Sequence, residues 1–185
     1  MRSTDSTVEL LEKVKALVRP ERLAHILRVA ELSREIAEKN GLDGERAYLA
    51  GLLHDAARDL PMEELLRLAP PENPVEEAHP LALHGRAARR LAEAWGVADR
   101  EVLEAIEGHV YGVDPQNGLG MALYIADISE PGRGVNGEIR ALALSGRLLE
   151  AYRQAVGNKV AYLQGKGIPI HPKTLEVYRG LQGAP

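Results

Sequence analysis

The chain has 185 residues, of which 45% are hydrophobic and 27% charged, values typical of one globular domain with a proper core. It has no cysteine, which excludes disulfides, zinc–thiolate sites and a thiol nucleophile, and fits a reducing cytosol. The net charge of −4 argues against a general nucleic-acid-binding surface, and neither a membrane-spanning run nor a signal peptide is evident. We therefore expect a cytoplasmic protein that binds no nucleic acid and no membrane.

Apolar residues recur at helical spacing almost throughout the chain, and no segment alternates strongly enough to predict a strand. The predicted fold class is therefore all-α. After a first helix around residues 8–18, a second is expected over about 20–40, with His25 on its apolar face. A third helix, capped by Asp43, should extend to about Arg58. Because it is apolar on nearly every side, we expect it to be the central buried helix.

Prolines and glycines divide the rest of the chain. A short helix over 62–69 should be followed by an exposed loop over 70–80, which holds four prolines and three glutamates. Further helices are expected over 81–95, from Asp99 to His109, over 121–129, over 137–163, and from His171 to about Gly180. We expect a single domain over residues 1–185, with a core at about 20–135 and C-terminal helices at about 137–181 packed on it.

Six side chains capable of binding metal fall on or beside these apolar helices. His54 and Asp55 are neighbours in the apolar run 47–57, where an ionised carboxylate is costly to bury without a partner. A metal ion is the strongest such partner, and imidazole with carboxylate suits Fe, Mn, Zn or Co. We expect the fold to bring together around metal the side chains of His25, His54, Asp55, His84, His109 and Asp127.

Four histidines and two aspartates are enough to hold two ions if one aspartate bridges them. Two ions about 3.5–4 Å apart can clamp a phosphate, activate a bridging hydroxide and neutralise the leaving oxygen. Each histidine taken alone could equally be a hydrogen-bonded core residue. The joint pattern favours metal, because an unpaired buried polar group costs about 1–3 kcal/mol. His79 lies in the expected exposed loop, and His171 is expected to cap the last helix.

The order His25, His54-Asp55, Asp127 resembles the pattern of the HD-domain superfamily of metal-dependent phosphohydrolases. Longer elements resemble the YqeK-type bacterial branch of that superfamily, from about residue 10 to residue 181. These elements are His25-x-x-Arg28, Leu49 to Arg58 (LAGLLHDAAR), His84-Gly85, Ala105-Ile106-x-x-His109, Ile125 to Arg133 (IADISEPGR) and Gly167 to Thr174 (GIPIHPKT).

Members of that branch are symmetrical bis(5′-nucleosyl)-tetraphosphatases, which split diadenosine tetraphosphate into two ADP at a di-metal site that favours iron. The resemblance implies one ion held by His25, His54, Asp55 and Asp127. It implies a second ion held by His84 and His109, with Asp55 and a hydroxide bridging the two; Mn, Co and Zn are alternatives to iron. It also implies catalytic roles for His54, Asp55 and Arg58, and substrate binding by Arg28, Arg58, Gly85 and Arg133.

Several positions differ from the pattern of this branch and leave the nucleotide substrate open. Val110-Tyr111-Gly112 follows His109 where Thr-Thr-Gly is favoured, and Arg58 replaces a lysine. The alternative substrates are dNTPs, alarmone pyrophosphates and cyclic nucleotides. The arginines favour a phosphate ligand over the O₂ chemistry of a minority of HD proteins. A non-catalytic helical module that binds nucleotide as a signal is a further alternative, and the apolar helix after Gly137 leaves a homodimer open.

Overall fold

The computed structural model describes residues 2–183, and over that range it contains helices and turns but no strand. The all-α prediction is thus confirmed. Two short 3-10 helices, η1 (Pro80–Leu83) and η2 (Pro131–Arg133), precede α6 and follow α8. The α-helices are α1 (Arg2–Lys15), α2 (Pro20–Lys39), α3 (Gly44–Leu53), α4 (Met62–Leu68), α5 (Pro74–Ala78), α6 (His84–Ala94), α7 (Arg100–Gly108), α8 (Gly118–Ser129), α9 (Gly137–Leu144), α10 (Leu148–Lys166) and α11 (Pro172–Gln182).

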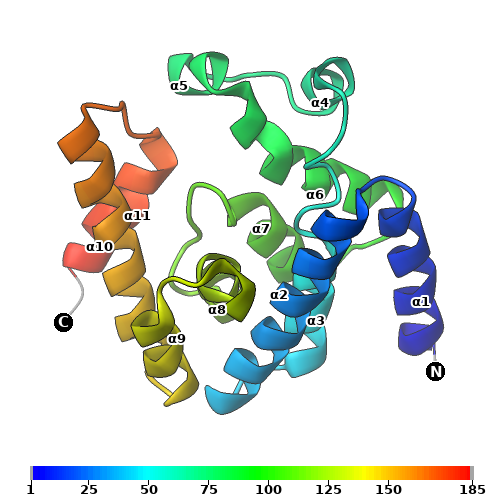
Figure 1. The fold of residues 1–185 in the computed structure, drawn as a ribbon, viewed down its shortest axis with the longest axis horizontal. Helices are drawn as coiled ribbons and strands as arrows, with labels where there is room; N and C mark the ends of the chain where they lie inside the picture. Colours follow the sequence, from blue (N-terminus) through cyan, green and yellow to red (C-terminus); the bar gives the residue numbers. More distant parts are fainter. Residues whose placement is uncertain (1, 184–185) are drawn as a thin grey trace.

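The centre of the fold is α8. The sequence pattern had predicted that the helix after Asp43 would lie there. α8 contacts α2, α3, α7, α9 and α10, and nine of its twelve residues are buried. Figure 1 shows α8 nearly end-on, with these helices around it. Burial on all sides is favourable because every side chain of α8 except those of Tyr124, Asp127 and Ser129 is apolar or absent.

Gly51 allows α3 to lie directly against α2. A Cβ atom at this position would lie 2.7 Å from the Ala30 Cα, which belongs to helix backbone and cannot move aside cheaply. α3 ends at Leu53, earlier than the predicted end at Arg58, and turns follow it. His54 and Asp55 therefore follow the helix instead of lying within it.

Two other regions differ from the predicted elements. The loop expected to be exposed over 70–80 contains α5, which Asn73 caps, and Glu76 within this helix is only 2% exposed. The long helix predicted over 137–163 is broken between α9 and α10, where Gly146 has a φ of 90°. Asn40, after α2, donates to the Ala143 carbonyl and accepts from the Leu148 amide, so tertiary contacts fix this turn.

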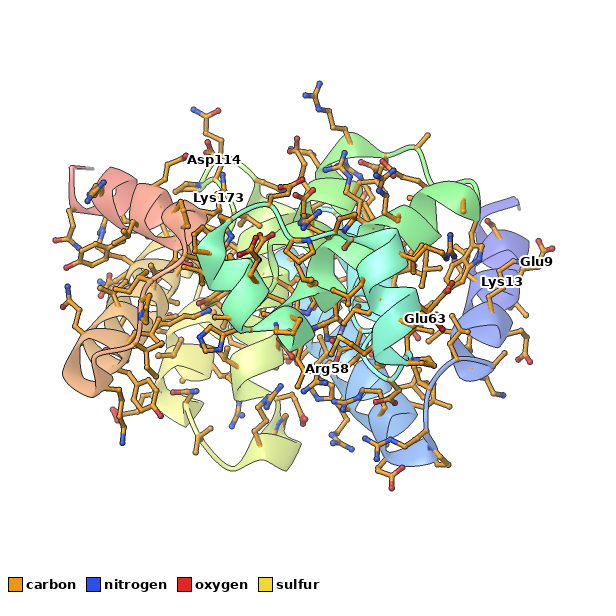
Figure 2. The ribbon with its side chains drawn as sticks, turned by 90° about the horizontal axis from the view of Figure 1, so that it is seen from above. Glu9, Lys13, Arg58, Glu63, Asp114 and Lys173 are labelled. Atoms are coloured by element: carbon orange, nitrogen blue, oxygen red, sulfur yellow. The ribbon has the colours of Figure 1, made fainter. Side chains whose placement is uncertain are left out.

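The C-terminal helices complete the molecule on one side. α10 packs against α8, α9 and α11, and α1 lies at the opposite edge of the ribbon (Figure 1). α4 and α5 lie nearest the viewer in Figure 2, and the label of Arg58 stands below them in that view. Among the described residues, no helix combines the length and the apolar character that a membrane span requires.

Candidate metal centre

Side chains from five helical regions converge on one place beside α8. Each of the six predicted metal-binding side chains is at most 14% exposed. His54 and His109 directly follow the last residues of α3 and α7, and His84 is the first residue of α6. The contributors are His25 of α2, His54 and Asp55 after α3, His84 of α6, His109 after α7 and Asp127 of α8.

Asp55 presents its two carboxylate oxygens to different histidines. Its Oδ2 lies 3.5 Å from Nε2 of both His25 and His54. Its Oδ1 lies 3.3 Å from Nε2 of His109 and 3.5 Å from Nε2 of His84. Asp127 Oδ1 lies 3.1 Å and 3.5 Å from Nε2 of His25 and His54. The cluster thus has a first half (His25, His54 and Asp127) and a second half (His84 and His109), and both share Asp55.

Backbone carbonyls fix the orientation of three of the histidine rings. Nδ1 of His54, His84 and His109 lies 2.6, 2.8 and 2.8 Å from the carbonyl oxygen three residues earlier. A carbonyl only accepts hydrogen bonds, so each Nδ1 carries a proton and donates it. In the neutral ring, Nε2 then directs a lone pair into the cluster, which is the tautomer that a metal ligand needs.

The carboxylate of Glu130 fixes the orientation of the fourth ring, that of His25. Its Oε2 lies 2.9 Å from His25 Nδ1, while Oε1 accepts from Arg28 Nε at 2.8 Å and from the Gly132 amide at 2.6 Å. Burial alone raises a carboxyl pKa, but hydrogen bonds from Arg28 and His25 lower the pKa of Glu130 to about 2. The ionised Glu130 therefore holds the His25 ring from outside the cluster.

The donor set and its electrostatics fit a divalent cation. His54 Nε2 is fully buried and has no hydrogen-bond partner among the described residues, although such an atom is costly unless something binds it. Burial raises the pKa of Asp55 and Asp127, but the charge of His54 and the close approach of His109 and His25 bring both below the ordinary value. Three overlapping His/Asp groups have donor atoms within 4.8 Å of one another. Nitrogen and ionised oxygen donors at this spacing suit transition metals.

The histidine pKa values differ between the two halves. Burial lowers the pKa of His54, but Asp55 and Asp127 outweigh it and raise the value to about 9. Burial and the neighbouring His109 lower the pKa of His84 to about 4, so this ring is neutral near pH 7. A cation that binds His54 must displace its proton, and binding should therefore release protons.

A cavity of about 810 Å³ opens onto the cluster and carries four cationic side chains. Arg133 Nη2 lies 3.1 Å from Asp127 Oδ1, and Arg22 Nε lies 3.3 Å from Asp59 Oδ1. The guanidinium of Arg58 forms no hydrogen bond or ion pair with the described residues. The residues that line the cavity include Arg22, Asp55, Arg58, His84, His109, Val110, Asp127, Arg133, Val135, Asn158, Lys159 and Tyr162.

Two residues expected to bind substrate lie elsewhere. Arg28 does not line the cavity and is paired with Glu130. Gly85 is buried where α6 meets α7, and a Cβ there would lie 2.7 Å from the Glu107 carbonyl oxygen, so helix packing requires the glycine. His79 is exposed, and His171 caps α11 as predicted, its Nδ1 accepting from the Lys173 amide.

Sequence reasoning assigned no role to three residues that the structure brings to the site. Glu130 follows Asp127 by one helical turn, and Arg22 precedes His25 by one turn, so helical spacing could have indicated both. Lys159 of α10 comes from the far end of the chain, and its ammonium donates to the Val110 carbonyl. No local sequence pattern predicts such a long-range contact.

The sequence pattern of the HD domain matches residues 22–132. A Bacillus subtilis protein named bis(5′-nucleosyl)-tetraphosphatase, symmetrical, is 31% identical over 179 residues, which are 94% of this chain and 96% of that protein. A Staphylococcus aureus protein of the same name is 33% identical over 177 residues, or 90% of this chain and 91% of that one.

Two further likenesses extend the comparison. A Mycoplasma genitalium protein named probable nicotinate-nucleotide adenylyltransferase/Ap4A hydrolase is 35% identical over 127 residues, and this chain spans only 36% of its length. The crystal structure of a Clostridium acetobutylicum protein described as a predicted HD superfamily hydrolase involved in NAD metabolism superposes with a TM-score of 0.85. That protein is 30% identical, and the match covers 94% of this chain and 95% of the other.

Proposed function

This chain belongs to the HD-domain family, and we propose that it hydrolyses diadenosine tetraphosphate symmetrically to two molecules of ADP. The Bacillus subtilis and Staphylococcus aureus relatives, which each match at least nine-tenths of the chain, are named symmetrical bis(5′-nucleosyl)-tetraphosphatases. The observation that carries the proposal is a His/Asp cluster whose two halves share Asp55, and Asp55 lines a cavity with several cationic side chains. Such an arrangement is suited to hydrolysis of a phosphoanhydride.

The cluster would hold two divalent cations, one in each half, with Asp55 between them. Iron is our first candidate, and Mn, Co and Zn fit the same nitrogen and oxygen donors. Such ions, when bound, supply Lewis-acid activation of water and neutralise charge on the phosphate oxygens. The chain itself keeps Asp55 ionised and keeps the Nε2 lone pairs of His84 and His109 directed inward.

The cations on the cavity wall would bind the tetraphosphate. Arg58 is the strongest candidate because its guanidinium has no ion-pair partner among the side chains that the structure describes and can offer two parallel donors to a phosphate. Arg133 and Arg22 already pair with Asp127 and Asp59, so they would share their remaining donors with substrate. These groups would neutralise the charge that develops on the departing ADP.

The rim of the cavity offers surface for a nucleobase. Tyr162 of α10 is 61% exposed and Val135 is 56% exposed, and both line the cavity. An exposed aromatic face and an exposed aliphatic side chain on one cavity suit a flat heterocycle. The volume of about 810 Å³ is within the usual range for ligand pockets.

Product analysis tests the reaction. The purified protein, loaded anaerobically with Fe²⁺ or separately with Mn²⁺, is incubated with diadenosine tetraphosphate, and the nucleotides are separated by chromatography. We expect ADP alone, and we expect Asp55→Asn to lower kcat/KM by at least about a hundredfold, because it removes the negative charge and one of the two oxygen donors that the halves share. ATP with AMP as products would contradict the proposal.

The substrate class needs a separate test because Val110, where the chain departs from the family pattern, lines the cavity. A panel of dNTPs, alarmone pyrophosphates and cyclic dinucleotides should be hydrolysed more slowly than diadenosine tetraphosphate. A tenfold higher kcat/KM for another nucleotide would reassign the substrate and leave the phosphohydrolase chemistry in place.

A further inference from the structure

The segment Gly167–Thr174 (GIPIHPKT) stands out in the sequence, but it lies outside residues 22–132 and its His171 does not line the cluster cavity. His171 reaches across to α5, where its Nε2 lies 2.8 Å from Glu76 Oε2. Since its Nδ1 accepts from the Lys173 amide, Nε2 carries the proton and donates it to Glu76. His171 therefore connects this segment to a buried carboxylate by a hydrogen bond.

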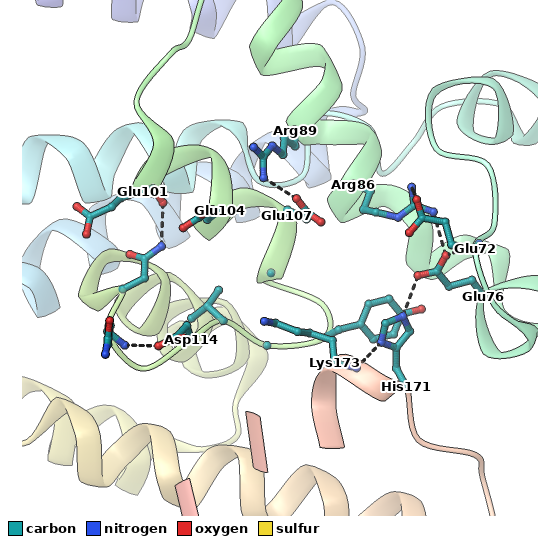
Figure 3. A pocket seen from close by; sticks show the side chains of 16 residues that line it. Glu72, Glu76, Arg86, Arg89, Glu101, Glu104, Glu107, Asp114, His171 and Lys173 are labelled. Carbon is teal, nitrogen blue, oxygen red and sulfur yellow. Dashed lines mark hydrogen bonds and ion pairs between the residues drawn. The ribbon is translucent and has the colours of Figure 1, made fainter. Parts of the chain in front are cut away.

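Glu76 gathers several donors although it is only 2% exposed. Its Oε1 accepts from Arg86 Nη2 at 2.9 Å and from the Glu72 amide at 2.9 Å. Burial raises a carboxyl pKa, but the hydrogen bonds from His171, the Glu72 amide and Arg86 leave the pKa of Glu76 below its ordinary value. Figure 3 shows Arg86 and His171 meeting Glu76 from opposite sides.

Arg86 and His171, which bind Glu76, are each connected to a histidine in the second half of the metal cluster. Arg86 follows His84 by two residues in the first turn of α6. The His171 ring stacks on Tyr111, with ring centroids 3.7 Å apart and planes inclined by 17°. Tyr111 follows His109 by two residues. One buried carboxylate thus links the segments that carry both histidines.

The C-terminal helices hold the loop after His109 at further points. Thr174 Oγ1 donates to the Tyr111 carbonyl at 2.7 Å, and Lys159 donates to the Val110 carbonyl. The Tyr152 hydroxyl bonds both the amide and the carbonyl of Val113, each at 2.8 Å. The loop that begins at His109 is therefore fixed against α10 and α11.

We propose that Glu76 and His171 are positioning residues that set the spacing of His84 and His109, and with it the affinity of the second half for a divalent cation. The inference rests on the proposed metal centre. The two Nε2 atoms lie 3.1 Å apart. Metal–nitrogen bonds are about 2.0–2.1 Å long, so two nitrogen ligands of one ion must lie within about 4.2 Å of each other, and these two atoms do. Small displacements of either segment would spoil that spacing.

Titration with Mn²⁺ in the absence of substrate tests the proposal. Calorimetry on the protein stripped of metal should show two sites in the wild type. Glu76→Gln keeps the shape of the side chain but removes its charge, and should weaken one site about tenfold or more while the other is unchanged. Glu77→Gln is the matched control, because Glu77 lies next in α5 and is exposed, and it should bind like the wild type.

A second pair of variants decides the matter should Glu76→Gln fail to fold. Tyr111→Leu removes the stacked ring and should weaken one site selectively. Tyr111→Phe keeps the ring and should bind like the wild type, because the Tyr111 hydroxyl is buried with no hydrogen-bond partner in the described structure.

The outcomes separate this inference from the proposed function. Two unchanged sites in Glu76→Gln and Tyr111→Leu, or equal weakening of both sites together with a lower Tm, would reduce Glu76 to a structural role and overturn the inference alone. A wild-type protein that binds no Mn²⁺ would overturn the metal centre as well. Mn²⁺ binding as expected with no hydrolysis of diadenosine tetraphosphate would uphold the positioning role and contradict only the proposed substrate.

Discussion

At the scale of single residues, Arg58 is the cavity cation with the most free capacity for a phosphate. Its guanidinium forms no hydrogen bond or ion pair with the described part of the chain, whereas Arg133 and Arg22 are paired with carboxylates. Arg58→Met keeps most of the aliphatic stem but loses the charge. A hydrogen bond to a charged group contributes about 1.5–3 kcal/mol, so we expect kcat/KM for diadenosine tetraphosphate to fall about 10- to 100-fold.

The control for Arg58 is Arg90→Met on α6, because Arg90 is exposed and does not line the cavity. Steady-state kinetics should be measured alongside metal content, which both substitutions should leave unchanged. Full activity in Arg58→Met would remove this residue from the substrate site.

Residue types and helical spacing predicted which six side chains would meet, and the structure brings them together. Their role as metal ligands is still a prediction. The partners of Glu130 could not be predicted in the same way. Arg28 is 102 residues away in the sequence, and its direction toward Glu130 instead of the cavity depends on how α2 crosses the end of α8. Contacts of that range are set by packing and leave no local pattern.

At the scale of elements, the contact of α3 with α2 sets the distance between His25 and His54. Gly51→Ala would place a Cβ 2.7 Å from the Ala30 Cα, so the helices would have to move apart. We expect a loss of about 1–3 kcal/mol in the free energy of unfolding, measured by chemical denaturation, because overpacking of a tight contact has this cost. Mn²⁺ binding should weaken too, since the two histidines stand on either side of this contact.

Gly157→Ala on α10 is the matched control for Gly51→Ala. A Cβ at Gly157 meets no atom within 4 Å, and alanine is favoured over glycine inside a helix by about 1 kcal/mol. We therefore expect Gly157→Ala to be neutral or mildly stabilising. Equal stability of the two variants would show that α2 and α3 can adjust freely.

The positions at which helices end could be predicted from the sequence only in part. Apolar spacing continues through residues 137–163, yet Asn40 binds both sides of the Gly146 turn and divides the segment into α9 and α10. The prolines of 70–80 correctly mark breaks, but Glu76 is buried because His171, 95 residues further on, and Arg86 reach it. Local propensity predicts that helices exist, whereas distant partners decide where they end.

At the scale of the whole molecule, the cluster joins helical regions that span residues 25–127, so a bound cation should stabilise the entire core. A ligand present at a hundred times its Kd adds about 2.7 kcal/mol to the free energy of unfolding. For a chain of this size, 1 kcal/mol corresponds to about 2–4 °C in Tm. Removal of Mn²⁺ by a chelator should therefore lower Tm by about 5–10 °C for each ion lost.

The stabilisation should depend on the cluster and not on general binding of cations to an acidic protein. Differential scanning calorimetry would compare the wild type with Asp55→Asn, each with Mn²⁺ and with excess chelator. Because Asp55 serves both halves, its loss should remove most of the Mn²⁺-dependent rise in Tm. The same variant lacks one buried carboxylate, so its Tm in chelator need not fall below that of the wild type. An equal Mn²⁺-dependent rise in both proteins would place the stabilising ions elsewhere and contradict a shared role for Asp55.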